Sequence, residues 1–213
     1  GCETYFRNPK LPPIGRVEGP AKKRLRIGMV VDSITGHPTD AETRATVEAT
    51  AKLLESLGHR VEPMPLPVPQ SFLEDFTLYW GLLAFLIATF GRFAVAPDFD
   101  AQKLDPLSRG LVDLYRKRIW DTPAMLYRMY RSEKLYAESF SAWDAVLTPV
   151  LGHTVPRLGH LNPEVPFELL FERLKAYVAF TPLNNAAGSP AISLPMGLTK
   201  NNLPVGIQLQ AAH

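Results

Sequence analysis

The sequence predicts an α/β fold in which a mixed β-sheet is flanked by helices. A short apolar, β-rich run at residues 25–32 is followed by a helical pattern and a second extended segment at 60–62, the order of a right-handed crossover unit. Residues 71–142 are mostly helical in period and would form a helical layer between strands. Another short apolar strand, at residues 144–149, follows that layer directly.

The composition is that of an ordinary soluble globular protein. Of the 213 residues, 46% are hydrophobic and 21% are charged, so the chain can bury a core within one domain or at most two. The formal charge of +2 is too balanced to indicate a nucleic-acid partner or an anionic membrane surface. The single cysteine, Cys2, excludes an internal disulfide, and we expect a cytoplasmic protein.

The longest apolar run does not predict a membrane span. It covers residues 76–90, which is 15 residues, whereas a bilayer takes about 20. We therefore expect a buried helix here. The first residues, 1–24, are rich in proline and end in a basic run, which predicts a linker ahead of a single α/β domain at 25–213.

The helix of the crossover unit has start and stop signals. Thr39 and Glu42 fit a capping box, so the helix is predicted to begin there, and Gly58 suits a C-terminal cap. The expected apolar stripe consists of Val47, Ala51, Leu54 and Leu57. Alternating prolines from Pro63 onward predict that the following strand is short or lies at a sheet edge.

The helical layer is punctuated by breaks at Gly91, Pro97, 105–106 and 121–123. One face of its last helix is predicted to carry Leu126, Met129, Tyr136 and Phe140. After the strand at 144–149 we expect a helix at 167–179, a polar loop with two amides, and extended segments at 191–194 and 205–209.

Several classes of chemistry are not supported by the sequence. The five histidines show no metal-ligand spacing, and no Gly-x-Ser-x-Gly elbow or Gly-rich phosphate loop is present. Acidic residues interleave the basic stretch at 116–134, which favours a solvated helix face over a nucleic-acid footprint. Trp80 and Phe85 would line an apolar pocket or simply pack in the core. No metal or cofactor is expected.

The most informative stretch lies near the C-terminus, at residues 180–197 and 203–208. It closely resembles the C-terminal motif of the amidase signature family, in which Phe-Thr-x-x-x-Asn is followed by Gly-x-Pro-Ala-x-Ser-x-Pro-x-Gly and Leu-Pro-Val-Gly-x-Gln. The matching positions are Thr181, Asn185, Gly188, Pro190, Ala191, Ser193, Pro195, Gly197, Leu203, Pro204, Val205, Gly206 and Gln208. Earlier segments agree with the family in their order along the chain.

The resemblance implies a serine-dependent amide hydrolase whose Ser-Ser-Lys residues lie upstream of this chain, because no Gly-Gly-Ser-Ser run occurs in it. The chain would then be a C-terminal fragment, inactive alone, with no catalytic residue of its own and with the upstream half of the enzyme as its partner. It would shape the pocket for a small-molecule amide. The expected substrate-binding residues are Trp80, Phe85, Thr148, Thr181, Asn184 and Asn185.

Two alternatives remain open at this point. The chain could be a noncatalytic α/β module that binds a ligand or partner, or the amidase-like subunit of an amidotransferase, which resembles the same family. Strands that would pair with the upstream half leave open edges, which invite self-association. We therefore expect the isolated chain to aggregate or to form a homo-oligomer.

Overall fold

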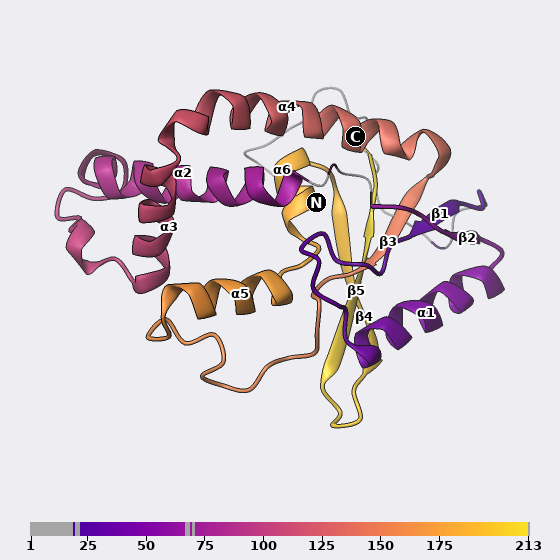
Figure 1. Ribbon diagram of the computed structural model, residues 1–213. Coiled ribbons are helices and arrows are strands. Elements are labelled where there is room, and N and C mark those ends of the chain that lie inside the picture. Colours follow the sequence, from indigo (N-terminus) through magenta and orange to yellow (C-terminus); the bar gives the residue numbers. More distant parts are fainter. Residues whose placement is uncertain (1–18, 20–21, 67–68, 70, 213) are drawn as a thin grey trace.

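A five-stranded mixed sheet lies at the centre of the computed structural model, which describes residues 19, 22–66, 69 and 71–212 (Figure 1). The strands are β1 (Arg26–Met29), β2 (Arg60–Pro63), β3 (Ala145–Pro149), β4 (Ala191–Leu198) and β5 (Pro204–Gln210). Their order is β2-β1-β3-β5-β4, with β1, β2 and β3 parallel and β5 antiparallel to both neighbours. The predicted α/β class is confirmed. The linker predicted at 1–24 falls mostly outside the described residues.

Helices cover both faces of this sheet. They are α1 (Ala41–Ser56), α2 (Phe72–Ala94), α3 (Pro106–Lys117), α4 (Thr122–Ser139), α5 (Phe167–Tyr177) and α6 (Pro182–Ala187). Helix α1 lies on one side of the sheet, whereas α2, α4 and α6 lie on the other (Figure 1). One core cluster, around Val47, Leu147 and Ile207, fills the α1 side. A second, around Tyr136 and Val146, fills the other side.

The crossover unit forms as predicted, although its helix cap is displaced by one residue. Asp40, not Thr39, is the N-cap of α1, and its carboxylate accepts a hydrogen bond from the Thr43 N–H at 2.7 Å. The Thr39 hydroxyl instead donates to the Val31 carbonyl. The Glu42 carboxylate accepts from the Lys200 N–H. The capping-box prediction is wrong because both of its side chains have tertiary partners.

The end of α1 follows the prediction more closely. Gly58 adopts φ +91°, a conformation that glycine tolerates without strain, directly after the helix. Val47 and Ala51 of the expected stripe are buried, and Leu54 is half-buried. Leu57 is 55% exposed and lies past the last helical residue, Ser56, so the stripe ends before it.

Helix α2 departs from the sequence prediction in two ways. It continues through Gly91 to Ala94, where glycine permits close packing: a Cβ there would lie 2.4 Å from the Phe99 ring. It is also not a buried helix, because its outer half leaves Leu83, Leu86, Ile87, Phe90 and Phe93 exposed. By length and composition α2 could cross a membrane, and 17% of its most apolar window is buried. The absence of a membrane span stays a prediction.

The remaining helical boundaries agree well with the sequence. Asp105 caps α3 through the Ser108 N–H, with Pro106 in the first turn, and α4 begins at Thr122. The predicted face of α4 is correct for Tyr136, whereas Leu126 is 43% exposed and its neighbour Met125 is fully buried. The apolar face of α4 is therefore rotated by about one residue at its start.

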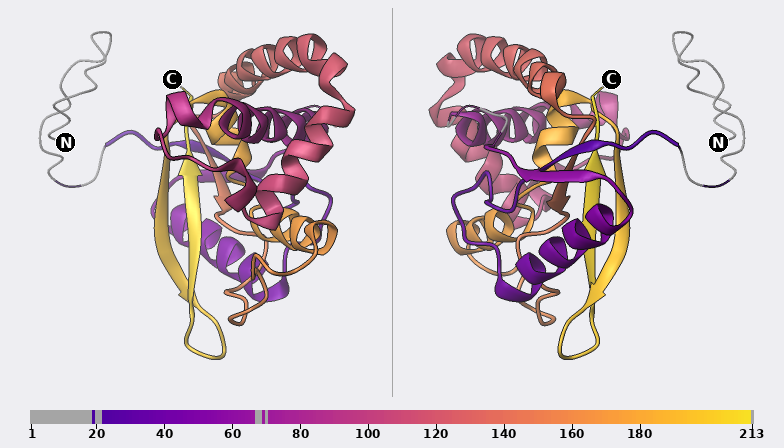
Figure 2. Two further views of the ribbon diagram at one scale, coloured as in Figure 1. Left: turned by 90° about the vertical axis from the view of Figure 1, so that its left-hand side faces the viewer. Right: turned by 90° about the vertical axis from the view of Figure 1, so that its right-hand side faces the viewer.

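The C-terminal region contains one further correction. Asn184 and Asn185 lie on the short helix α6 and not in a polar loop, because Pro182 opens a helical turn. Gly188 then ends this helix at φ +64°. The strands predicted at 191–194 and 205–209 are confirmed and form the antiparallel hairpin β4–β5, which runs along an outer side of the molecule (Figure 2).

Candidate functional site

A buried polar network lies on the sheet face that α4 and α6 cover. Thr148 on β3 and Gln208 on β5 are partners in the sheet register, so their side chains emerge side by side. The Thr148 hydroxyl oxygen accepts hydrogen bonds from Gln208 Nε2 at 3.0 Å and Gln210 Nε2 at 3.1 Å. It donates its own proton to the Pro149 carbonyl at 2.7 Å. All three polar side chains are at least nine-tenths buried.

The network continues into the helices. The Tyr136 hydroxyl on α4 donates to Gln210 Oε1 at 2.6 Å, and the Asn184 amide on α6 approaches the same hydroxyl at 3.5 Å. Asn184 Nδ2 also donates to the Ser189 hydroxyl at 2.8 Å. Burial raises the pKa of the Tyr136 hydroxyl above its ordinary value. The hydrogen bonds with Ser189 and Asn184 lower this pKa by less than burial raises it, so the phenol stays protonated at neutral pH. Asn184 Oδ1 is buried and has no hydrogen-bond partner among the described residues.

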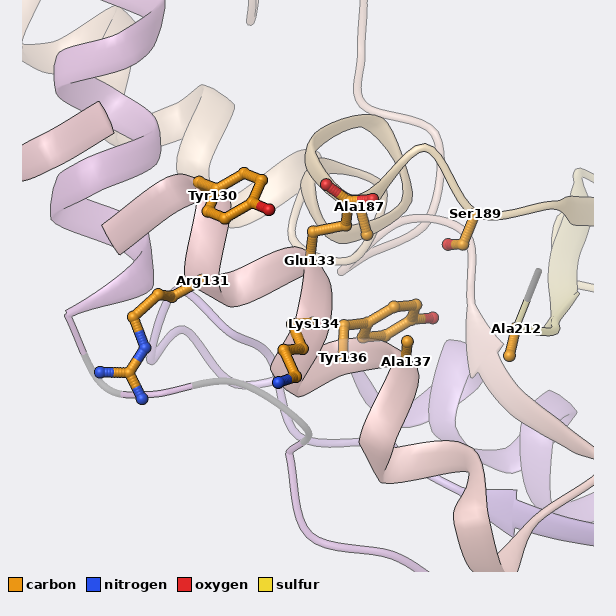
Figure 3. Close-up of a pocket in the computed structure, with 9 residues that line it drawn as sticks. All are labelled: Tyr130, Arg131, Glu133, Lys134, Tyr136, Ala137, Ala187, Ser189 and Ala212. Carbon is orange, nitrogen blue, oxygen red and sulfur yellow. The ribbon is translucent and has the colours of Figure 1, made fainter. Parts of the chain in front are cut away.

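A cavity of about 290 Å³ lies beside the network. In Figure 3, the Tyr136 hydroxyl lies on the side of its ring nearer to Ser189 and Ala212, whereas the charged ends of Arg131 and Lys134 point to the opposite side of the view. The cavity is lined by Tyr130, Arg131, Glu133, Lys134, Tyr136, Ala137, Ala187, Ser189 and Ala212. A network of uncharged hydrogen-bonding side chains beside a cavity is suited to orient the neutral polar groups of a ligand.

The hydrogen bond of Ser189 does not activate its hydroxyl as a nucleophile. The hydrogen-bond partner of the Ser189 hydroxyl is an amide, not a base that could accept its proton. Among the residues that the structure describes, no group of three His, Cys, Asp or Glu side chains could hold a metal ion. The arrangement can bind and orient a neutral group.

Of the four polar site residues predicted from the sequence, two belong to the buried network and two do not. Thr148 and Asn184 belong to one network, although they are far apart in the sequence. Thr181 is half-buried at the N-cap of α6, and Asn185 is exposed on the same helix.

The two aromatic candidates have other contacts. The Trp80 ring packs against Phe171 on α5, with 6.1 Å between ring centroids. The Phe85 ring packs against Tyr115 on α3 at 5.2 Å. The structure therefore places Trp80 and Phe85 in helix packing and does not bring them into the polar network.

Sequence reasoning did not name four of the six network residues as site residues: Tyr136, Ser189, Gln208 and Gln210. One signal was available. Gln208 and Gln210 are separated by two positions in an otherwise apolar strand, so they face the same side of the sheet and need polar partners there. The contact with Tyr136 has no sequence signal, because α4 and β5 are distant in the chain.

Replacing Tyr136 with phenylalanine is expected to lower the free energy of unfolding by about 1–3 kcal/mol, because buried Gln210 Oε1 loses its donor. Chemical denaturation measures this change. The matched control is Tyr130→Phe on the same helix, where the side chain is 75% exposed and little change is expected. Equal effects of the two substitutions would contradict a structural role for the buried hydroxyl.

Asp40 forms a second polar centre, at the carboxyl end of β3. Besides capping α1, its carboxylate accepts the Thr154 N–H at 2.5 Å, and its own N–H donates to the Gly152 carbonyl at 3.0 Å. Burial would raise the pKa of Asp40, but the hydrogen bonds from Thr43 and Thr154 outweigh burial and hold that pKa below its ordinary value. Asp40 thus ties the start of α1 to the loop after β3.

This depressed pKa predicts a pH dependence of stability. A carboxylate with a lowered pKa in the folded state stabilises the protein above its unfolded pKa of about 3.9, and this contribution is lost as pH falls through the folded pKa. We expect Asp40→Asn to reduce stability by about 1–2 kcal/mol at neutral pH, with the difference from wild type shrinking below about pH 4. Thermal melts across pH measure it.

The control for Asp40 is Asp105→Asn. Asp105 is also an N-cap with a lowered pKa, due first to the Ser108 hydroxyl, but its partners lie within its own helix. A smaller loss is expected there. A difference between Asp40→Asn and wild type that persists unchanged down to about pH 2 would contradict the assignment to the carboxylate.

Comparison with known proteins identifies the family of this chain. A family model described as Amidase matches residues 9–213. The chain belongs to the amidase family. This confirms the resemblance found in the C-terminal motif, whose two extended segments form the hairpin β4–β5 of this amidase chain.

The relatives of this amidase chain are longer proteins. It is 41% identical over 211 residues to "Putative amidase AmiC" of Mycobacterium leprae (strain TN), covering 99% of this chain and 45% of that protein. It is 28% identical over 222 residues to a glutamyl-tRNA(Gln) amidotransferase subunit of Clostridium acetobutylicum, covering 90% of this chain and 43% of that one. The chain thus spans less than half the length of these relatives.

A solved structure has the same fold. The structure of 6-aminohexanoate cyclic dimer hydrolase complexed with substrate superposes with a TM-score of 0.71 at 24% identity, covering 91% of this chain and 42% of that one. At this level of identity the likeness concerns the fold.

Proposed function

We propose that this chain is the C-terminal, substrate-pocket portion of a serine-dependent amidase that hydrolyses amide C–N bonds. The observation that carries the proposal is the match to AmiC of Mycobacterium leprae, which takes in nearly all of this chain but only 45% of that protein. The Ser-Ser-Lys residues that break the bond would lie in the other part of the longer enzyme, and this chain alone would be inactive.

The buried network supports a positioning role in that enzyme. Hydrogen bonds of Thr148, Gln208 and Tyr136 link β3, β5 and α4 to the short helix α6, which contains Asn184 and Asn185 and has Thr181 as its N-cap. Uncharged side chains of this kind suit a neutral amide substrate. Trp80 and Phe85, on α2, would contribute apolar walls farther from the network. The proposed substrate-binding residues are thus Trp80, Phe85, Thr148, Thr181, Asn184 and Asn185.

The amidotransferase alternative has weaker support. The amidotransferase subunit of Clostridium acetobutylicum is 28% identical to this chain, against 41% for AmiC of Mycobacterium leprae, and the formal charge of +2 gives no support to a tRNA partner. Ammonia transfer to a charged tRNA acceptor in the presence of the other amidotransferase components would identify that function.

The test uses two readouts, bond cleavage and serine labelling. The chain is expressed alone and co-expressed with the portion of Mycobacterium leprae AmiC that it does not match, and each sample receives a simple anilide. We expect hydrolysis only in the co-expressed sample, and a serine-reactive phosphonate should label only the AmiC portion. Turnover of the anilide by the purified chain alone at enzyme-like rates, or labelling of one of its own serines, contradicts the proposal.

A related prediction concerns the oligomeric state of the isolated chain. Within the described residues, the sheet ends at β2 and β4 in edges without a neighbouring strand, and such edges associate with one another. We expect sedimentation velocity to show dimers or larger species for chain 1–213 at about 10–100 µM, the range in which exposed edges self-associate. A monodisperse monomer with sharp, cooperative thermal unfolding contradicts this expectation.

A further inference from the structure

A second cavity, of about 320 Å³, lies between the loop after β3 and the hairpin β4–β5. It shares no lining residue with the cavity beside the polar network. The loop is fixed on two sides: the Val150 N–H donates to the Gly206 carbonyl at 3.3 Å, and the Gly152 N–H donates to the Tyr177 carbonyl at the end of α5 at 2.8 Å (Figure 1). The cavity is therefore bounded by backbone that is already hydrogen-bonded.

The wall of this second cavity is mostly apolar. Seven of its twelve lining residues are valine, leucine or proline, and none of the twelve is charged. The cavity beside the network, by contrast, has Arg131, Glu133 and Lys134 in its wall. A charged ligand would lose water in the second cavity without gaining a countercharge, which is costly. The wall therefore favours a neutral ligand with an apolar body.

His153 places one unused hydrogen-bond acceptor in this wall. Its Nδ1 lies 2.7 Å from the Thr154 carbonyl oxygen. Because a carbonyl can only accept, Nδ1 carries the hydrogen, and in the neutral ring Nε2 has a free lone pair. Nε2 has no hydrogen-bond partner among the described residues. It is also accessible, unlike Thr43 Oγ1 in the same wall, which is fully buried.

Neighbouring rings fix the orientation of this imidazole. The His153 ring packs on the Tyr177 ring with 4.9 Å between centroids, and the His160 ring meets it edge-on at 6.2 Å. Together with the bond from Nδ1, these contacts set the direction of Nε2 before a ligand arrives. A binding group that is held in place in this way loses little freedom on binding, which favours affinity.

We propose that this cavity binds a small neutral molecule that has an apolar ring and one O–H or N–H donor, with the donor bonded to His153 Nε2. A phenol has this chemistry. The volume lies at the lower end of the range of about 300–1,000 Å³ for ligand pockets, so a molecule of one ring fits it. The site goes beyond the proposed amidase function, because it contains none of the network residues and none of the proposed substrate-binding residues.

A titration that compares p-cresol with toluene tests the proposal. The two molecules share a methyl-bearing ring, but only p-cresol has a donor. Affinities for chain 1–213 are measured by ligand-observed NMR at about pH 8, where free imidazole is neutral. We expect His153→Phe to weaken p-cresol binding about 3–10-fold, because the hydroxyl loses its acceptor, and to leave toluene binding within about twofold.

Histidine labelled with ¹⁵N gives a readout that does not depend on the folding of a variant. In the wild-type chain, p-cresol is expected to shift the Nε2 signal of one of the five histidines, and toluene is not. The signal that His153→Phe removes identifies this histidine. A shift at another histidine, or no shift in the presence of saturating p-cresol, overturns the proposal.

Two further variants serve as controls. His160→Phe makes the same change in a ring that touches His153 but does not line the cavity, and it should leave p-cresol binding unchanged. Ser193→Phe adds a ring to the wall on β4 and should abolish binding of both molecules. Equal losses in His153→Phe and His160→Phe overturn the proposal, as does binding that Ser193→Phe does not reduce.

The same titration is made on the chain co-expressed with the portion of Mycobacterium leprae AmiC that it does not match. Retained p-cresol binding supports a ligand site in the longer protein. Loss of binding there would mean that polypeptide fills the cavity, and it overturns the proposal. Anilide hydrolysis is measured separately, so the proposed function and this site stand or fall independently.

Discussion

Replacing Thr148 with valine is expected to lower the free energy of unfolding by about 2–6 kcal/mol, because two buried amide donors lose their acceptor at once. Valine has nearly the shape of threonine, so packing around β3 is kept. Gln208 Nε2 and Gln210 Nε2 both donate to the Thr148 hydroxyl oxygen, and both glutamines are nearly fully buried. Each unpaired donor would contribute about 1–3 kcal/mol of destabilisation. Urea denaturation measures the sum.

The same substitution at Thr50 provides the control. Thr50 is as buried as Thr148, but its hydroxyl donates to the Thr46 carbonyl within α1, an acceptor that the helix itself already uses. Thr50→Val should therefore leave stability within about 1 kcal/mol of wild type. If Thr50→Val and Thr148→Val lowered the free energy of unfolding equally, the buried hydrogen bonds to Thr148 would contribute no more to stability than the hydroxyl of Thr50.

The strands and the crossover unit could be predicted because they depend on local pattern. Apolar runs bounded by proline, such as residues 144–149, become central strands, and Ala145–Pro149 is indeed buried along its whole length. The cap of α1 could not be assigned to the correct residue. Thr39 and Asp40 are both good caps, and the choice between them is made by Val31 and Thr154, which only the fold brings near.

The errors in the helical layer have the same physical origin. Gly91 reads as a helix end, but the Phe99 ring needs that space, and the helix continues past it. The apolar run of α2 reads as buried, whereas the described chain covers only its first half. An apolar sequence indicates that a segment has surface to bury. It does not indicate which other part of the protein covers that surface.

The candidate site was predictable in part for similar reasons. Thr148 was predicted at the end of a strand and Asn184 within the C-terminal stretch that resembles the family, next to the motif position Asn185, but Tyr136 was assigned only to core packing. The structure shows both roles for Tyr136: its ring packs edge-on against Phe140 at 5.1 Å while its hydroxyl joins Gln210. A buried tyrosine usually finds a hydrogen-bond partner, but sequence cannot name it.

Replacing Gly152 with alanine is the other large effect that we expect, a loss of about 3 kcal/mol from overpacking. Gly152 lies just past β3, where its N–H donates to the Tyr177 carbonyl at 2.8 Å. A Cβ there would lie 2.2 Å from the Ala176 carbonyl oxygen and 3.2 Å from the Ala179 Cβ. Because the nearest atom belongs to the backbone at the end of α5, no side-chain rotation relieves the clash.

To relieve that clash, α5 would have to move away from the loop after β3. The same loop anchors α1, because the Gly152 carbonyl accepts the Asp40 N–H. Gly206→Ala is the matched control, because its nearest neighbour at 3.2 Å is the Val150 Cγ2, a side-chain atom that can turn aside. Thermal unfolding should therefore separate the two variants, with Gly152→Ala the less stable. Equal melting temperatures would mean that α5 moves freely relative to β3, and the loop after β3 could then not act as a rigid link between α1 and the polar network.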